Sequence, residues 1–118
     1  MPANCQRGAV LEVNLDPSLG REYMKTRPCL VVQSDRLNKY SQLTVVVPIT
    51  GAENIKRLGP TFIPIRKGEA GLSKDSVAIC HQIRVVDESR LGKQLGYVKQ
   101  ETMQAVARAL KVVLDLDN

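Results

Sequence analysis

The residues best suited to chemistry in this chain lie in a polar loop and at the start of the apolar segment that follows it. The loop carries Arg21, Glu22 and Lys25, and Arg27 stands directly before Pro28 and an apolar run. Pro28 disfavours a helical conformation at Arg27 and lacks an amide donor, so we expect a strand to begin here. A cation held where a polar loop meets a rigid strand is well placed to bind a phosphate group.

Several segments, beginning with this loop, form a pattern that is met in a known family. In chain order they are LDPSLGRE, KTRPCLVV, VVVPIT, GLSKDSVAICHQIRVVD and RLGKQLG, and an amphipathic segment closes the chain. With these motifs, which cover about residues 7–116, the sequence resembles the MazF/PemK/Kid family of toxin endoribonucleases. The resemblance implies the toxin of a type II toxin–antitoxin system, a sequence-specific and metal-independent endoribonuclease that cuts single-stranded mRNA and so inhibits translation and growth.

The resemblance also implies a reaction and a set of partners. Attack of the 2′-OH on the adjacent phosphate would leave a 2′,3′-cyclic phosphate and a 5′-OH, and no cofactor is implied. The implied partners are single-stranded RNA, a second copy of the chain in a homodimer, and an acidic MazE-like antitoxin, which we expect to be partly disordered. DNA would be bound only through the complex with the antitoxin.

Three residues are implied as catalytic by their match to the family motifs: Arg27, Thr50 and Glu22. The Arg27 guanidinium can bind two phosphate oxygens and keeps its proton at neutral pH, so we expect it to stabilise charge rather than to act as a base. The Thr50 hydroxyl can donate to a phosphate oxygen, although a threonine at a strand end also commonly bonds its own turn. Glu22 is expected to orient Arg27 or to accept a proton; as a solvated ion pair it would contribute little.

Polar side chains around Arg27 are expected to contact RNA. Gln82 matches a family glutamine near the RNA and can read a base edge, while His81 beside it suits the rim of the site better than catalysis. Ser76 is expected to begin a strand at the rear of the site. The full set expected to bind RNA is Arg21, Lys25, Gln82, His81, Arg7 and Lys56.

Other ways of cleaving RNA find little support in the residue types. His81 is the single histidine, which excludes a two-histidine mechanism. A two-metal site requires clustered carboxylates, and the acidic residues that might supply them form no recognisable ligand set: Asp16, Glu22, Asp35, Asp75 and Asp87. Arginine, hydroxyl groups and backbone amides remain, and these act mainly by positioning and electrostatics.

Composition sets the broad class of the chain. We expect 118 residues to form one domain, spanning residues 1–118. The net charge of +5 and the pI near 9.3 suit RNA or an acidic partner, although charge alone is weak evidence. An aromatic content of 3% argues against an RNA-stacking platform.

Cysteine usage and apolar runs indicate the cellular compartment. Cys5, Cys29 and Cys80 are odd in number and lack paired spacing, which favours reduced thiols over disulfides or a zinc site. The N-terminal MPANCQRG has no apolar signal region, and the longest apolar runs are too short to span a bilayer. We therefore expect a cytoplasmic protein without membrane contact.

The spacing of apolar residues predicts a mainly β chain closed by one helix. Leu11, Val13 and Leu15 alternate with polar residues, as in a half-buried strand. Strands are expected over residues 8–15, 29–33, 43–49, 61–65, 76–79 and 82–86, and Pro64 places the fourth at a sheet edge.

The last segment carries the clearest helical signal. Met103, Val106 and Leu110 recur at helical spacing, but Lys99 is a poor N-cap. A short helix is also possible over residues 87–91. Pattern alone fits an α+β sandwich equally well; the resemblance implies an SH3-like small barrel of the MazF/CcdB-type toxin fold with a C-terminal amphipathic helix.

Two other functions are compatible with this fold. A CcdB-like toxin would poison DNA gyrase without cleaving anything, but such proteins depend on a C-terminal Trp-Gly-Ile, and this chain has no tryptophan. A degenerate toxin would only bind RNA or its antitoxin. The family's opening Arg-Gly-Asp-aromatic reads Arg7-Gly8-Ala9-Val10 here, so the lost carboxylate at Ala9 keeps that possibility open, while Arg27 and Thr50 argue against it.

Overall fold

The structure is a computed structural model that describes residues 5–116. Residues 1–4 and 117–118, which the expected domain includes and on which the expected absence of a signal segment partly rests, lie outside the described residues. The strands are β1 (Ala9–Asn14), β2 (Thr26–Val31), β3 (Leu43–Gly51), β4 (Phe62–Ile65), β5 (Ser76–Ile79), β6 (Arg84–Asp87) and β7 (Leu91–Tyr97). The helices are α1 (Asp35–Asn38) and α2 (Gln100–Leu114), with single 3₁₀ turns η1 (Ala52–Asn54), η2 (Glu69–Gly71), η3 (Cys80–Gln82) and η4 (Glu88–Arg90).

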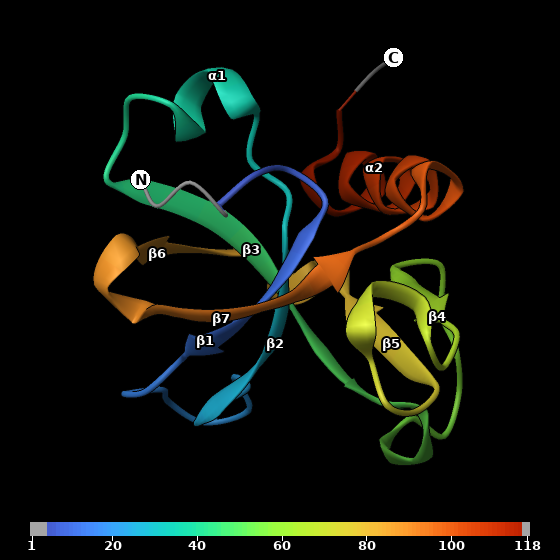
Figure 1. Ribbon diagram of the computed structural model, residues 1–118. Helices are drawn as coiled ribbons and strands as arrows, with labels where there is room; N and C mark the ends of the chain where they lie inside the picture. Colours follow the sequence, from blue (N-terminus) through green and yellow to red (C-terminus); the bar gives the residue numbers. More distant parts are fainter. Residues whose placement is uncertain (1–4, 117–118) are drawn as a thin grey trace.

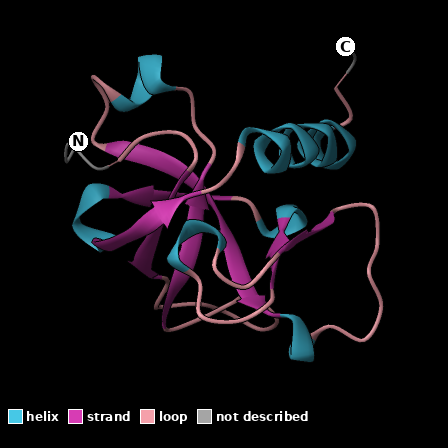
Figure 2. Ribbon diagram, turned by 45° about the vertical axis from the view of Figure 1, so that its right-hand side comes forward, coloured by secondary structure: helices cyan, strands magenta, loops and turns pink. Residues whose placement is uncertain are grey.

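All strand pairs are antiparallel, in the order β4-β5-β3-β2-β1-β7, with β6 also paired to β3 (Figure 1). The long strand β3 organises this sheet, because its first part pairs with β6, its middle with β2 and its end with β5. Arg27 near the start of β2 and Thr50 near the end of β3 therefore come to the same end of the sheet. Figure 2 shows α2 lying across one side of the strands and the long loop after η1 projecting from the sheet.

Alternation along the strands divides the buried side chains into two clusters. Val10, Leu30 and Ile49 belong to the cluster covered by α2, whose Val106 and Ala109 are buried against it. Their strand neighbours point the other way, into a second cluster: Ala9, Leu11, Val13, Cys29, Val31 and Val46. Successive strand residues face opposite sides of a sheet. The alternation in the sequence predicted a half-buried strand, whereas β1 carries buried side chains on both faces.

The expected strands are confirmed apart from their ends, and the edge position of the strand containing Pro64 is confirmed. β2 begins at Thr26, so Pro28 is its third residue and not its first; Pro28 lies opposite Glu12 of β1, beyond the part of β2 that pairs with β3. Gln82 lies in η3 and not in a strand. The short helix expected over residues 87–91 is the 3₁₀ turn η4.

One strand, β7 (Leu91–Tyr97), is absent from the prediction. Its sequence has no apolar alternation, and its pairing with β1 is interrupted by register shifts. Its glycines allow close approach: a Cβ at Gly92 would lie 3.1 Å from the Glu12 carbonyl oxygen, and one at Gly96 2.7 Å from the Ala70 carbonyl carbon. Glycine is depleted in strands because it packs poorly, so packing against the rest of the fold explains this strand.

The N-terminus of α2 has a cap supplied from elsewhere in the chain. Lys99 occupies the N-cap position and its side chain caps nothing, as expected from the sequence. The Glu69 carboxylate of η2 instead accepts hydrogen bonds from the Lys99 amide (2.9 Å) and the Thr102 hydroxyl (2.6 Å). A negative charge at this position also suits the helix dipole. None of the described helices is long and apolar enough to cross a membrane.

The cysteine side chains lead to a first prediction. Cys5, Cys29 and Cys80 are buried free thiols, and burial raises the pKa of all three. The pKa of Cys29 rises to about 12 although Arg27 and Arg84 oppose the shift, and that of Cys80 rises to about 11. Because the thiolate is the reactive form, the folded protein should not react with DTNB near pH 8, whereas guanidinium-unfolded protein should react at all three thiols. Rapid labelling of any thiol in the folded protein would contradict its burial.

Candidate functional site

The Arg27 side chain lies at the start of β2 and is held by the loop before it. Its Nε donates to the Met24 carbonyl oxygen (3.2 Å), and its guanidinium carbon lies 4.6 Å from the centre of the Tyr23 ring. Within residues 5–116 it has no carboxylate partner. The guanidinium is therefore oriented by a ring and a carbonyl group, without an ion pair.

Arg27 and Thr50 share one pocket, which we call the Arg27–Thr50 pocket. It has a volume of about 230 Å³ and is lined by Arg27, Pro28, Ile49, Thr50, Gly51, Asn54, Leu72, Ser73, Lys74 and Ser76. Thr50 is only 5% exposed, and its hydroxyl oxygen accepts a hydrogen bond from the side-chain amide of Asn54 (3.0 Å). Among the described residues no acceptor takes the hydroxyl proton, so the hydroxyl retains its capacity to donate.

Ser76 and Lys74 also line this pocket. Ser76 begins β5, as predicted, and is buried, with its hydroxyl donating to the Lys74 carbonyl oxygen (2.9 Å). The Lys74 ammonium group is paired with Glu53 at 2.7 Å, and both side chains are more than half exposed. Lys74 was missed by sequence reasoning, although its position in the GLSKDS motif just before Ser76 could have indicated it.

Glu22 does not lie against Arg27. Its carboxylate accepts a hydrogen bond from the Leu19 amide (2.9 Å), and its own amide donates to the Leu19 carbonyl oxygen (3.1 Å). These bonds turn the carboxylate back onto its own loop. The expected contact between Glu22 and Arg27 is thus absent from the described structure, because the tight turn takes precedence over an exposed ion pair.

Glu22 lines a second pocket, which we call the Gln82 pocket, with a volume of about 570 Å³. Its lining combines charged, amide and ring groups: Leu15, Arg21, Glu22, Tyr23, Pro48, His81, Gln82, Ile83 and Arg84. The His81 ring is stacked on Phe62 with their centres 5.3 Å apart. Three residues expected to contact RNA, Arg21, His81 and Gln82, are therefore brought together here.

The Gln82 side chain is engaged by the loop on the other side of this pocket. Its amide oxygen accepts from the Tyr23 backbone amide (2.9 Å), and its amide nitrogen donates to the Arg21 carbonyl oxygen (3.3 Å). In this state both ends of the Gln82 amide hold the loop. Reading of a base by Gln82 stays a prediction, and it would require exchange of these bonds.

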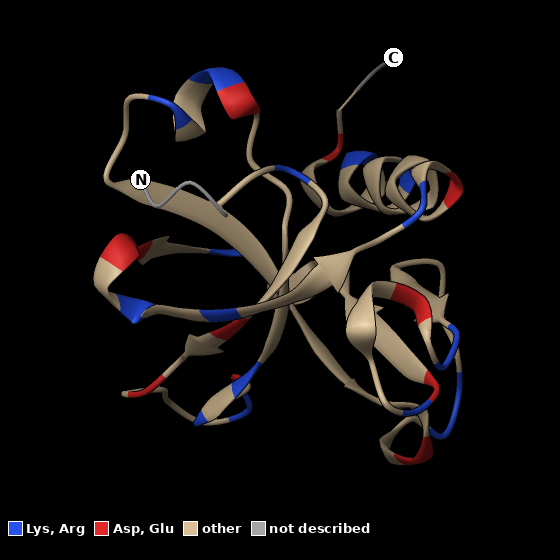
Figure 3. Ribbon diagram, viewed as in Figure 1, with Lys and Arg blue, Asp and Glu red and all other residues tan. Residues whose placement is uncertain are grey.

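Two arginines that the sequence analysis did not select lie at the base of the same loop. Arg84 donates to the Leu15 carbonyl oxygen (3.1 Å), while Arg90 donates to the carbonyl oxygens of Asn14 (3.0 Å) and Asp16. Figure 3 shows positively charged positions at the start of β2, on β6 and along β7. The only local signal for Arg84 was the motif HQIR, in which it follows Gln82.

The remaining residues expected to bind RNA lie at different distances from the pockets. Lys25 is exposed in the loop, where its amide donates to the Asp16 carboxylate (2.8 Å). Lys56 is exposed in the long loop after η1. Arg7 lies at the far end of β2 from Arg27, where its backbone amide bonds Asp35 and its guanidinium bonds the Val32 carbonyl oxygen. Within one protomer Arg7 is therefore not part of either pocket, and RNA binding by it stays a prediction.

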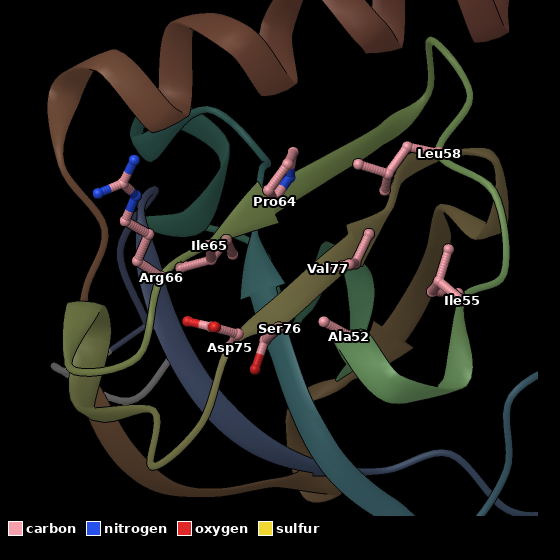
Figure 4. A pocket seen from close by; sticks show the side chains of 9 residues that line it. All are labelled: Ala52, Ile55, Leu58, Pro64, Ile65, Arg66, Asp75, Ser76 and Val77. Carbon is pink, nitrogen blue, oxygen red and sulfur yellow. The ribbon is translucent and has the colours of Figure 1, made fainter.

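A third pocket lies between the loop after η1 and strands β4 and β5 (Figure 4). It has a volume of about 530 Å³, and its lining is largely apolar: Ala52, Ile55, Leu58, Pro64, Ile65, Arg66, Asp75, Ser76 and Val77. It shares Ser76 with the Arg27–Thr50 pocket. In the described part of the chain, no three His, Cys, Asp or Glu side chains group as possible metal ligands.

Comparison with known proteins gives consistent results. Residues 6–114 match the family model described as PemK-like, MazF-like toxin of type II toxin–antitoxin system. An endoribonuclease MazF of Staphylococcus saprophyticus is 38% identical over 111 residues, which are 94% of this chain and 92% of the relative.

Solved structures share the fold. The Mycobacterium tuberculosis toxin MazF-mt6 has a TM-score of 0.77 at 26% identity, with 93% of this chain and 99% of that chain covered. An endoribonuclease in complex with its cognate antitoxin, from a mycobacterial species, also has a TM-score of 0.77, at 24% identity, with 96% and 97% covered. The expected fold class is confirmed, and the chain belongs to the family of PemK-like, MazF-like toxins of type II toxin–antitoxin systems.

Proposed function

We propose that this MazF-like endoribonuclease toxin cleaves single-stranded mRNA at a specific short sequence without a metal ion, and thereby inhibits translation and growth. Family membership and the 38% identical endoribonuclease support the general activity. The observation that carries the finer proposal is the pocket shared by Arg27 and Thr50, which come from different strands and offer hydrogen-bond donors to one space.

In this mechanism the RNA phosphate occupies the Arg27–Thr50 pocket. The 2′-oxygen forms a bond to phosphorus and loses its proton, while the bond from phosphorus to the 5′-oxygen breaks and that oxygen takes a proton from solvent water. The products are a 2′,3′-cyclic phosphate and a 5′-OH. Arg27 stays protonated and binds two phosphate oxygens, and the Thr50 hydroxyl donates to one of them, so both stabilise the charge of the transition state.

Glu22 is the proposed acceptor of the 2′ proton. A carboxylate can serve as a general base when it comes within hydrogen-bond reach of that proton. In the free protein the Glu22 carboxylate bonds the Leu19 amide, so the proposal requires RNA in the neighbouring Gln82 pocket to release it. Glu22→Gln tests this role, because it replaces the carboxylate by an amide that cannot accept the 2′ proton.

Residues around the Arg27–Thr50 pocket are proposed to select the RNA sequence that is cut. Arg21, Gln82 and His81 would contact nucleotides in the Gln82 pocket, and Lys25 would add charge beside Arg27. Lys56 would contact RNA from the loop after η1, and Arg7 only where a second protomer brings it near the RNA.

We further propose that residues 1–118 act as one domain that forms a homodimer in the cytoplasm. The net charge of +5 suits both RNA and an acidic MazE-like antitoxin. The solved endoribonuclease–antitoxin complex, whose fold this chain shares, supports a partner of this kind. Binding to DNA would occur through the antitoxin complex.

The test uses purified protein and a long RNA in excess EDTA, with the cut ends mapped by primer extension. We expect discrete cuts at a recurring short sequence. The new 5′ ends should accept phosphate from polynucleotide kinase without prior phosphatase treatment, because they carry hydroxyl groups. If the folded wild-type protein leaves the RNA intact in EDTA and cuts it only after a divalent metal ion is added, metal independence is refuted.

Intact RNA under all these conditions would favour the other two functions. Inhibition of gyrase-catalysed supercoiling would then indicate a CcdB-like toxin. Antitoxin binding without either activity would indicate a degenerate toxin.

A further inference from the structure

Arg27 must be held in place by something other than a carboxylate. Glu22, the carboxylate expected to orient it, is bound to its own loop. Apart from one hydrogen bond from Nε to the Met24 carbonyl oxygen, the contact that the described residues provide is the Tyr23 ring, 4.6 Å from the guanidinium carbon.

A ring is well suited to orient an arginine that has to bind phosphate. Stacking on the ring face restrains the guanidinium plane while its N–H donors, which lie in that plane, remain free for an anion. A carboxylate partner would instead occupy the same donors and offset the positive charge. The contact with Tyr23 therefore fixes Arg27 without competing with the substrate.

The backbone of Tyr23 is itself held on both sides. Its amide donates to the Gln82 amide oxygen (2.9 Å), and its carbonyl oxygen accepts from the Ser18 hydroxyl (3.0 Å). Gln82 also binds the Arg21 carbonyl oxygen (3.3 Å), so a residue 59 positions away along the chain fixes the loop on which the ring is mounted. The Tyr23 hydroxyl makes no hydrogen bond to any described residue.

We propose that Tyr23 is a positioning residue that holds the Arg27 guanidinium in its phosphate-binding orientation, and that Gln82 holds Tyr23. This proposal rests on the proposed endoribonuclease function. It assigns to Gln82 a role in the free protein that is separate from base recognition, and it assigns a role to Tyr23 that no motif indicated.

The central test compares Tyr23→Leu with Tyr23→Phe. Tyr23→Leu removes the ring and keeps the backbone amide, while Tyr23→Phe keeps the ring and loses only the unbonded hydroxyl. We expect Tyr23→Leu to lower kcat about 2- to 5-fold with little change in KM, since a cation–π contact that is not fully buried has that range of effect. Tyr23→Phe should retain the wild-type rate. Tyr40→Leu is the matched control, because Tyr40 is 82% exposed near α1 and has no contact with the loop.

Double variants separate positioning from direct RNA contact. If Tyr23 acts through Arg27, adding Tyr23→Leu to Arg27→Ala should cause no further loss of rate. Gln82→Ala should lower kcat less than Tyr23→Leu does, and should likewise add nothing to Arg27→Ala. An additive loss, or a Tyr23→Leu effect on KM with kcat unchanged, would overturn the proposal and indicate that Tyr23 stacks on RNA.

A spectroscopic readout keeps this proposal distinct from the proposed function. In the free protein, the ring current of Tyr23 should shift the NMR signal of the Arg27 Nε–Hε group. The shift should persist in Tyr23→Phe and disappear in Tyr23→Leu. An unchanged Arg27 signal in Tyr23→Leu would refute the positioning role even if the wild-type protein cleaves RNA. Loss of the shift in Tyr23→Leu, together with RNA that the wild-type protein leaves intact, would refute only the endoribonuclease proposal.

Discussion

Arg27→Ala should lower the rate of RNA cleavage by about two to three orders of magnitude, the usual cost of removing a group that stabilises transition-state charge. Arg27 supplies the permanent positive charge of the Arg27–Thr50 pocket, since the nearby Lys74 is already paired with Glu53. The measurement is the single-turnover rate on an oligonucleotide that contains the mapped cleavage site. Arg27→Lys should be intermediate, because lysine keeps the charge but lacks the planar fork that binds two phosphate oxygens.

The stability of Arg27→Ala should change little. The side chain is only partly buried and makes one hydrogen bond and one ring contact. We expect a change of at most about 1 kcal/mol in the free energy of unfolding, because exposed contacts of this kind contribute that much. A folded Arg27→Ala that cleaves at the wild-type rate would remove Arg27 from the mechanism.

Gly71→Ala should strongly destabilise the folded protein. Gly71 has φ +73°, and a Cβ there would lie 2.1 Å from the Leu95 carbonyl oxygen and 2.8 Å from its carbon. Both atoms belong to the backbone of β7, so the clash cannot be relieved by a side-chain rotation. We expect a decrease of about 3 kcal/mol or more in the free energy of unfolding, from the strained φ and the overpacking together.

Gly68→Ala is the matched control for this prediction. Gly68 has φ +94°, but a Cβ there would meet no atom within 4 Å. It should therefore cost only the backbone strain, about 1–2 kcal/mol. Urea unfolding of both variants measures the difference, and equal losses would show that β7 does not approach η2 this closely.

The structure brings together two residues that were selected by their match to the family motifs. Arg27 and Thr50 line one pocket, and their catalytic roles stay predictions. Ser76, which begins β5 as predicted, lines the same pocket. Alternating apolar residues likewise predicted most strands, since each pattern depends on a few consecutive residues.

The errors concern contacts that a local pattern does not encode. Glu22 was expected to orient Arg27 because it matches an acidic residue of a family motif, but a turn within the loop directs the carboxylate away. The poor N-cap at Lys99 was recognised, but its replacement by Glu69 was not. β7 carries no strand pattern, and its glycines are explained only by the backbone atoms that approach them.

By itself, then, the sequence determined the family, the mainly β architecture with its closing helix, and the arginine and hydroxyl available for chemistry. The tertiary structure decided which side chain orients Arg27, that Gln82 holds the loop, and which arginines lie at the loop base. The physical reason is that strand and turn preferences act over a few residues, whereas the bonds of Gln82, Arg84 and Arg90 join residues 59, 69 and 76 positions apart, which only the folded chain brings together.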